Sequence, residues 1–209
     1  MNIDYTQLAI LFLVLLISLS VHEAAHAWTA DRLGDPTARR LGRVSLNPVV
    51  HVDPIGTIVF PLVAIVSNLP LIGWAKPVPV STAHLREHWR QKFMVIAAAG
   101  PASNLVLATI AAVALRAVGP ADGGETTVQL GAILERTVFL NVLLAVFNMI
   151  PVPPLDGGNV LAGVLTGPIA DAYDRLRPFG FLILYGLMFT GMLWTLISPP
   201  ASFLLSWLL

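Results

Sequence analysis

Two histidines and a glutamate stand together at the end of the first apolar run, where His22, Glu23 and His26 form the pattern H-E-x-x-H. If residues 8–30 are helical, the two histidines lie one turn apart on one face, with Glu23 beside them. Imidazoles at this spacing can hold one Zn²⁺ at about 2.0 to 2.1 Å from each ring nitrogen. The glutamate can then act as general base on the water that the metal activates. The pattern therefore predicts a catalytic site with one zinc ion per chain.

The histidine pair does not complete such a site, because catalytic zinc usually has three protein ligands and one open position. Asp156 follows Pro151, Pro153 and Pro154, which cannot continue a helix. A carboxylate at such a break in an apolar chain is costly unless it is paired or bound to a metal, so we expect Asp156 to be the third ligand. Two alternatives stay open: Asp156 is the N-cap of a helix over residues 159–169, and the histidines are ordinary core residues.

The composition predicts the class of protein. Of 209 residues, 56% are hydrophobic and only 11% are charged, which is typical of an all-α polytopic membrane protein, here a single domain over residues 1–209. The formal net charge is zero, so nothing supports a nucleic-acid partner. The chain has no cysteine, which excludes disulfides and thiolate ligands and leaves histidine and carboxylate side chains to bind a metal.

Four apolar runs predict spans over residues 8–30, 93–118, 130–150 and 179–197, in a total of four to six transmembrane helices. Arginines follow the first run and no basic residue precedes it, so the positive-inside rule places the N-terminus outside and the metal site towards the cytoplasmic side of the cell membrane. We expect Ser198, Pro199 and Pro200 to stop the last span, which leaves a tail over residues 201–209 too short to cross.

The segment over residues 55–72 is apolar but is interrupted by Gly56, Pro61, Asn68 and Pro70. Basic residues flank it on both sides, so a single crossing would put one basic loop on the wrong side of the membrane. We therefore expect a re-entrant hairpin or a pair of short helices rather than one straight span. Short β-like stretches are expected on the cytoplasmic side, at residues 43–46 and 76–80.

Taken together, three motifs resemble the site-2 protease family of intramembrane zinc metalloproteases. They are His22-Glu23-Ala-Ala-His26, Gly100-Pro-Ala-Ser-Asn104 and Asn148-x-x-Pro-x-Pro-x-Leu-Asp156-Gly-Gly. The stretches over residues 47–54 and 73–80 resemble the compact bacterial and archaeal branch of that family, which lacks PDZ and CBS domains.

The resemblance implies that His22, His26 and Asp156 are the zinc ligands. It implies that Glu23 activates the water that attacks a peptide carbonyl and then passes the proton to the leaving amine. Asn148 is expected in the catalytic neighbourhood, where it holds the substrate strand or the oxyanion, and Asn104 is expected to line the core beside it.

Three further histidines need separate interpretation. His51 looks like a family position and is expected to be a secondary active-site or gate residue, not a metal ligand. His84 and His88 are also four residues apart, but they lie in a polar, basic segment, so exposed side chains are favoured there over a second metal site.

The substrates that the resemblance implies are single-span membrane proteins in the lipid bilayer, such as anti-sigma factors or remnant signal peptides, cleaved in regulated intramembrane proteolysis. Residues 43–46 and 76–80 would clamp the unwound substrate strand by β-addition. Two other functions compete: a transporter, since broken helices and buried ionisable residues also mark transport sites, and a catalytically silent membrane scaffold with a structural metal. The intact set of His22, Glu23, His26 and Asp156 disfavours the silent scaffold. The oligomeric state is not predicted.

Overall fold

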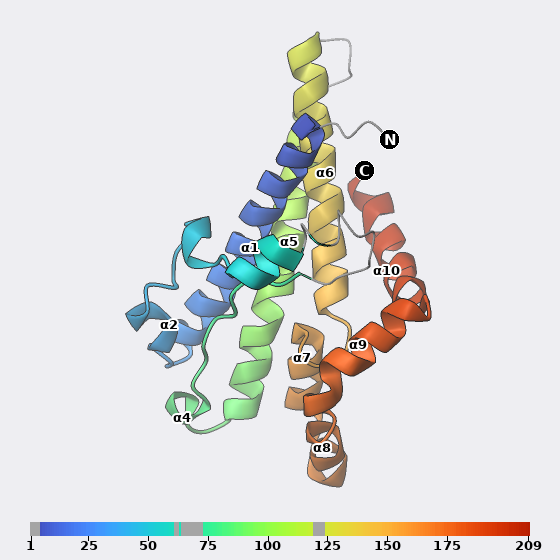
Figure 1. Ribbon diagram of the computed structural model, residues 1–209. Helices are drawn as coiled ribbons and strands as arrows, with labels where there is room; N and C mark the ends of the chain where they lie inside the picture. Colours follow the sequence, from blue (N-terminus) through green and yellow to red (C-terminus); the bar gives the residue numbers. More distant parts are fainter. Residues whose placement is uncertain (1–4, 61–62, 64–72, 119–123) are drawn as a thin grey trace.

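The computed structural model describes residues 5–60, 63, 73–118 and 124–209 (Figure 1). Within these ranges the chain is helical and contains no strand. Three of its helices are long and apolar enough to cross a membrane: α1 (Tyr5–Arg32), α5 (Trp89–Val118) and α6 (Glu125–Asn148). They contain the predicted spans at 8–30 and 93–118 and nearly all of the span at 130–150. The all-α, multi-pass prediction is therefore confirmed.

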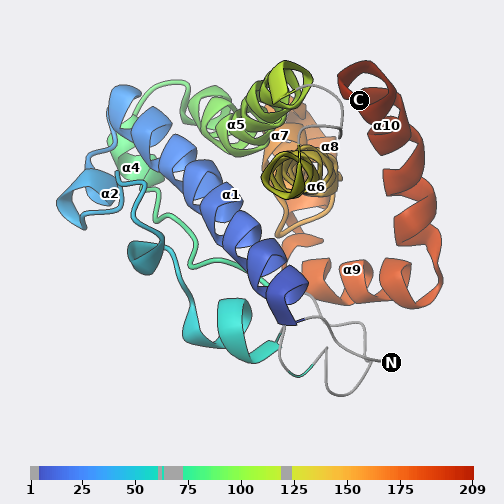
Figure 2. The same cartoon turned by 90° about the horizontal axis from the view of Figure 1, so that it is seen from above.

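The three long helices pack side by side, and α10 (Met192–Leu208) packs against α6 at a steep angle (Figure 2). The core between α5, α6 and the C-terminal helices is made of small and branched apolar side chains. Small residues let the helix axes approach closely, which strengthens van der Waals packing between them. Buried members of this core are Ala108, Ala111, Ala112, Val138, Val142, Leu184, Ile197 and Ala201.

The prediction for the last span was wrong. Instead of one helix over residues 179–197, the chain forms α9 (Gly180–Phe189) and α10, and the segment bends by 81° between them. The break lies at Gly191, whose φ of 75° is a conformation that favours glycine. Counting the bent pair as one span gives at most four candidate spans in the described ranges, the lower end of the expected number.

The prolines that were expected to stop the last span do not stop it. Pro199 and Pro200 lie inside α10, which continues to Leu208, so the predicted tail belongs to a helix. A proline removes one backbone hydrogen bond, but membrane helices tolerate it where neighbouring structure covers the freed group, and α10 packs against α6.

Between α1 and α5 the described chain holds four short helical segments: α2 (Thr37–Arg40), η1 (Pro48–Val50), η2 (Pro54–Val59) and α4 (Thr82–Leu85). Residues 43–46 and 76–80 are not strands. Pro77 and Pro79 have no N–H to donate, which weakens any strand pairing there. The expectation of a re-entrant hairpin can be compared with the structure only as far as η2 and residues 60 and 63, since the rest of 55–72 lies outside the described residues.

After α6 the chain breaks at its prolines and continues as α7 (Asp156–Val164), α8 (Gly167–Asp174) and the short η3 (Arg177–Phe179). The helix expected over residues 159–169 thus begins three residues earlier and ends at Val164. Its start is pressed against the break, because a Cβ on Gly157 would overlap the carbonyls of Met149 and Ile150. This close packing fixes the position of Asp156.

Candidate metal centre

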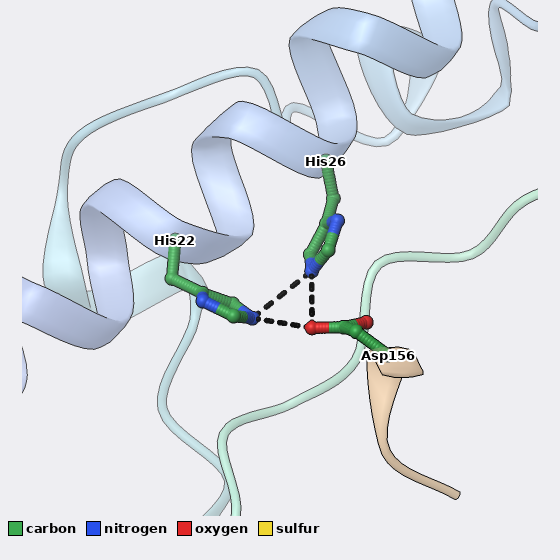
Figure 3. Close-up of side chains that lie close together, drawn as sticks. All are labelled: His22, His26 and Asp156. Carbon is green, nitrogen blue, oxygen red and sulfur yellow. Dashed lines mark hydrogen bonds and ion pairs between the residues drawn. The ribbon is translucent and has the colours of Figure 1, made fainter. Parts of the chain in front are cut away.

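The side chains of His22, His26 and Asp156 converge on one point (Figure 3). His22 Nε2 lies 3.0 Å from Asp156 Oδ2, His26 Nε2 lies 3.3 Å from the same oxygen, and the two Nε2 atoms are 3.0 Å apart. The histidines come from one face of α1, and the aspartate is the first residue of α7. Over the described part of the chain, no other three His, Cys, Asp or Glu side chains gather closely enough to bind one metal ion.

Hydrogen bonds at the far side of each ring determine which nitrogen carries the proton. His22 Nδ1 is 2.6 Å from Asn104 Oδ1, and His26 Nδ1 is 2.7 Å from the Ile96 carbonyl oxygen. Both partners are oxygens that accept, so each Nδ1 donates its proton and each neutral ring has an unprotonated Nε2. The two lone pairs therefore point at each other and at Asp156.

Three electron-rich atoms at this separation repel one another unless a cation lies between them. Asp156 Oδ2 is buried and no hydrogen-bond donor satisfies it. Ligand atoms about 2.0 to 2.1 Å from a tetrahedral zinc ion lie roughly 3.3 Å from each other, close to the distances observed here. Ring nitrogens held by outer oxygens, together with one carboxylate, are a typical zinc-binding set. The residues present therefore fit zinc.

A glycine gives the two rings their room. A Cβ on Gly100, in α5, would overlap the imidazoles of both His22 and His26. The G-P-A-S-N motif therefore contributes in two ways. Gly100 leaves space for both rings, and Asn104 Oδ1 accepts a hydrogen bond from the Nδ1–H of His22.

Asp156 does not cap its helix. The N-cap position of α7 is Leu155, with no side-chain cap, and the Asp156 carboxylate faces the histidines instead. The alternative of a plain helix cap is wrong for this residue.

Glu23 and Asn148 line one cavity of about 1000 Å³ together with the three converging side chains. Glu23 is buried, and its Oε2 accepts the N–H of Val78 at 3.1 Å. Asn148 is the last residue of α6, is partly exposed, and donates to the Leu144 carbonyl at 2.9 Å. Most of the lining is apolar, including Leu19, Phe60, Trp74, Phe93, Phe147, Phe181, Leu184 and Tyr185.

The structure places His51 outside this cavity. Its side chain is 2% exposed and its Nε2 is 2.7 Å from the Ser45 carbonyl, while its own carbonyl accepts the N–H of Lys76 at 2.8 Å. The Arg43 side chain also donates to the Lys76 carbonyl. His51 and Arg43 therefore hold the segment that presents Val78 to Glu23, and neither touches the converging side chains.

His84 and His88 do not form a second centre. His84 Nδ1 lies 3.0 Å from Asp35 Oδ1, and α4 ends at Leu85, before His88. Neither residue belongs to a metal-capable group within the described ranges.

Four contributors were missed by reading the sequence: the Ile96 carbonyl, the Val78 N–H, Gly100 as a packing site, and Asn141, which hydrogen-bonds to Asn104. Two of these are backbone groups, which carry no sequence signal. Asn141 could have been found, because an amide inside an apolar span is rarely without a partner.

Comparison with known proteins decides the family. The chain matches the family described as "Peptidase family M50" over residues 117–185, a stretch that contains Asn148 and Asp156. It is 31% identical to YwhC of Bacillus subtilis, named as a candidate zinc metalloprotease, over 90% of this chain and 85% of that protein. The chain belongs to peptidase family M50.

Longer M50 relatives also match. Rip2 of Mycolicibacterium smegmatis, likewise named as a candidate zinc metalloprotease, is 34% identical over 84% of this chain and 64% of its own length. Rip2 of Mycobacterium tuberculosis strain H37Rv is 30% identical over 81% of this chain and 62% of its own length. No solved structure gives a significant match. Membership in M50 makes the chain a multi-pass membrane metalloprotease with a zinc cofactor, in agreement with the resemblance to compact site-2 proteases.

Proposed function

We propose that this M50 protein is an intramembrane endopeptidase that binds one zinc ion at His22, His26 and Asp156. In this proposal it cleaves transmembrane segments of single-span membrane proteins during regulated intramembrane proteolysis. Anti-sigma factors and remnant signal peptides are suitable substrates, since each presents one apolar helix to the bilayer. The whole activity belongs to one membrane-embedded domain, residues 1–209.

The observation that carries the proposal is the convergence of two unprotonated Nε2 atoms and one buried carboxylate oxygen on a single point. Because the three residues come from α1 and α7, the geometry arises only when the fold is complete. The adjoining cavity, with its mainly apolar lining, suits an apolar peptide segment of several residues.

A bound zinc ion supplies Lewis acidity, which lowers the pKa of water to about 7 and polarises a carbonyl. Glu23 is the proposed general base: it accepts the proton of the attacking water and returns it to the leaving amine. Its carboxylate is oriented for this by the N–H of Val78. Asn148, which lines the same cavity, holds the substrate strand or its oxyanion.

A transmembrane helix must unwind before it is cut, since helical carbonyls are hydrogen-bonded and covered. Residues 76–80 are held at the cavity by Arg43 and His51 and border Glu23. We propose that the unwound strand lies against this segment, so that its scissile carbonyl comes beside Glu23.

Glu23→Gln tests the enzyme function. The full chain and the variant are purified in detergent, their zinc content is measured by mass spectrometry, and each is reconstituted with tagged single-span test proteins. Glu23→Gln is expected to keep about one zinc per chain and lose cleavage by at least about 10³-fold, because only the base is removed. A zinc-loaded parent that cleaves no single-span protein faster than Glu23→Gln does would contradict the proposed function.

The orientation has its own test. The chain has no native cysteine, so a single introduced cysteine reports one position without background. Arg40 in α2 and Thr126 in α6 are both exposed. With the N-terminus outside, a maleimide that cannot cross membranes labels Thr126→Cys in intact cells and labels Arg40→Cys only after lysis. The reverse pattern would overturn the proposed orientation.

A further inference from the structure

A row of buried polar side chains lies behind His22. Ser18 in α1, Asn104 in α5 and Asn141 in α6 are each 0% exposed. Asn104 Nδ2 donates to Asn141 Oδ1 at 2.8 Å, and Asn141 Nδ2 donates to Ser18 Oγ at 2.8 Å. We propose that Asn141 and Ser18 are positioning residues: acting through Asn104, they keep His22 in the tautomer whose Nε2 is free to bind the metal. This inference rests on the proposed metal centre.

Backbone carbonyls determine how the Ser18 hydroxyl and the Asn141 amide are oriented. Ser18 Oγ donates to the Val14 carbonyl at 2.7 Å, so its hydrogen is committed and its oxygen accepts from Asn141. Asn141 Nδ2 also donates to the Thr137 carbonyl at 2.8 Å. Carbonyl oxygens only accept, so a reversed Asn141 amide would set oxygen against oxygen. The Oδ1 atom of Asn141 must therefore face Asn104.

The same reasoning fixes Asn104. Its Nδ2 lies between two acceptors, Asn141 Oδ1 and the Ser18 carbonyl, the latter at 3.3 Å. A reversed amide would set its oxygen against both and turn an N–H towards His22. The ring would then have to accept at Nδ1 and carry its proton on Nε2, and the lone pair that faces Asp156 would be lost.

Without Asn141, only the longer bond to the Ser18 carbonyl would favour the correct amide orientation. In a dry interior an unsatisfied amide is costly, so each acceptor contributes strongly to the preference. A plain packing role, in which the amides only hold α1, α5 and α6 together, makes a different prediction: any equally destabilising change in α6 would weaken the metal site as much.

The test measures zinc affinity by chelator competition on the purified full chain. Asn141→Leu is expected to weaken zinc binding about 10-fold, at the low end of the effects typical of outer partners of metal ligands. With Co²⁺ in place of Zn²⁺, its visible absorption band is expected to shift or lose intensity. Ser18→Ala, a smaller change that keeps the fold if Asn141→Leu does not, is expected to weaken binding less.

Val138→Ala is the matched control, since Val138 is buried in α6 close to Asn141 and makes no polar contact with the row. It is expected to lower thermal stability without changing zinc affinity or the cobalt band. Asn104→Asp is the rescue variant. Both oxygens of its carboxylate accept, so the His22 tautomer no longer depends on Asn141, and adding Asn141→Leu is expected to cost no further affinity.

Two results would overturn the inference: zinc affinities of Asn141→Leu and Ser18→Ala within twofold of the parent, or an equal loss in Val138→Ala. Failure of the metal centre itself looks different. In that case the parent would bind no zinc, or Asp156→Ala would bind it as well as the parent does.

Discussion

Two pairs of histidines have the same spacing in this chain and very different surroundings. His22 and His26 lie on one face of α1 and are 4% and 8% exposed. His84 lies in the four-residue helix α4, its side chain is 45% exposed, and the helix ends before His88. His88 itself has a φ of 56°, far from helical values. A spacing of four residues brings two rings together only where the helix continues through both.

The second difference concerns the far side of each ring. The Nδ1–H groups of His22 and His26 each donate a hydrogen bond to an oxygen of α5, which leaves each Nε2 free to bind a metal. His84 instead directs Nδ1 at Asp35 and Thr37, at 3.0 and 3.2 Å. Outer hydrogen bonds, rather than the motif alone, distinguish a ligand pair from a pair of surface histidines.

The largest expected effect comes from removing the shared carboxylate. Asp156→Ala leaves two nitrogen ligands, so zinc content is expected to fall from about one per chain to near zero after dialysis, with a loss of affinity of at least about 100-fold. Mass spectrometry of the purified proteins measures it. A variant that retains stoichiometric zinc would exclude Asp156 as a ligand.

Gly100→Ala is expected to have the next largest effect. The added methyl group would overlap both imidazoles, so zinc affinity is expected to fall about 10- to 100-fold as the rings are displaced. Gly186→Ala is the matched control, because a Cβ there meets nothing within 4 Å. Chelator competition on both variants decides the matter, and equal affinities would show that the rings do not depend on Gly100.

Asp35, which contacts His84, makes the stability of the fold depend on pH. Burial alone would raise the pKa of Asp35, but hydrogen bonds from Thr37, Ser81 and His84 outweigh it and lower that pKa below the ordinary 3.8. The ionised carboxylate therefore stabilises the fold above about pH 4, and this contribution is lost as the pH falls through the folded-state pKa.

Asp35→Asn is accordingly expected to lower the free energy of unfolding at pH 7 by about 1 to 3 kcal/mol, through weaker hydrogen bonds. Thermal unfolding in detergent between pH 7 and pH 3 measures it. The difference in stability between the parent and Asp35→Asn is expected to become smaller below pH 4. A gap that is constant over the whole range would mean that the charge of Asp35 does not contribute.

The smallest expected effect sharpens the contrast between the pairs. His88→Ala is expected to leave zinc content and zinc affinity unchanged within twofold, because His88 lies outside the converging group. The same chelator competition measures it. A second zinc ion in the parent that is absent from His88→Ala would contradict the distinction drawn between the two pairs.

Sequence patterns predicted the long helices and the convergence of His22, His26 and Asp156 well. The apolar runs are long enough to decide helix position, and buried ionisable side chains in such runs require partners. The end of the chain was predicted poorly. A single glycine decides the bend at Gly191, and a glycine in an apolar run has no distinctive local pattern. Pro199 and Pro200 lie inside α10, which packs against α6, a contact that appears only in three dimensions.

The environment of the site was harder to predict than its motif residues. His51 was expected near the reaction but lies behind the segment that borders Glu23, because sequence order places it beside a basic loop without showing which way its ring points. The start of α7 was predicted three residues too late, at residue 159 instead of Asp156, for a similar reason. The packing of Gly157 on the preceding break sets it, and that contact is tertiary.

The bond between the Val78 N–H and Glu23 has a consequence for how this protein tolerates mutation. The donor belongs to the main chain, so every amino acid except proline supplies it, while the Val78 side chain itself lines the cavity. Pro77 and Pro79 on either side have no N–H, so no adjacent residue can take over the role. An alanine at position 78 would keep this hydrogen bond, and only a proline there would remove it and reveal its part in the site.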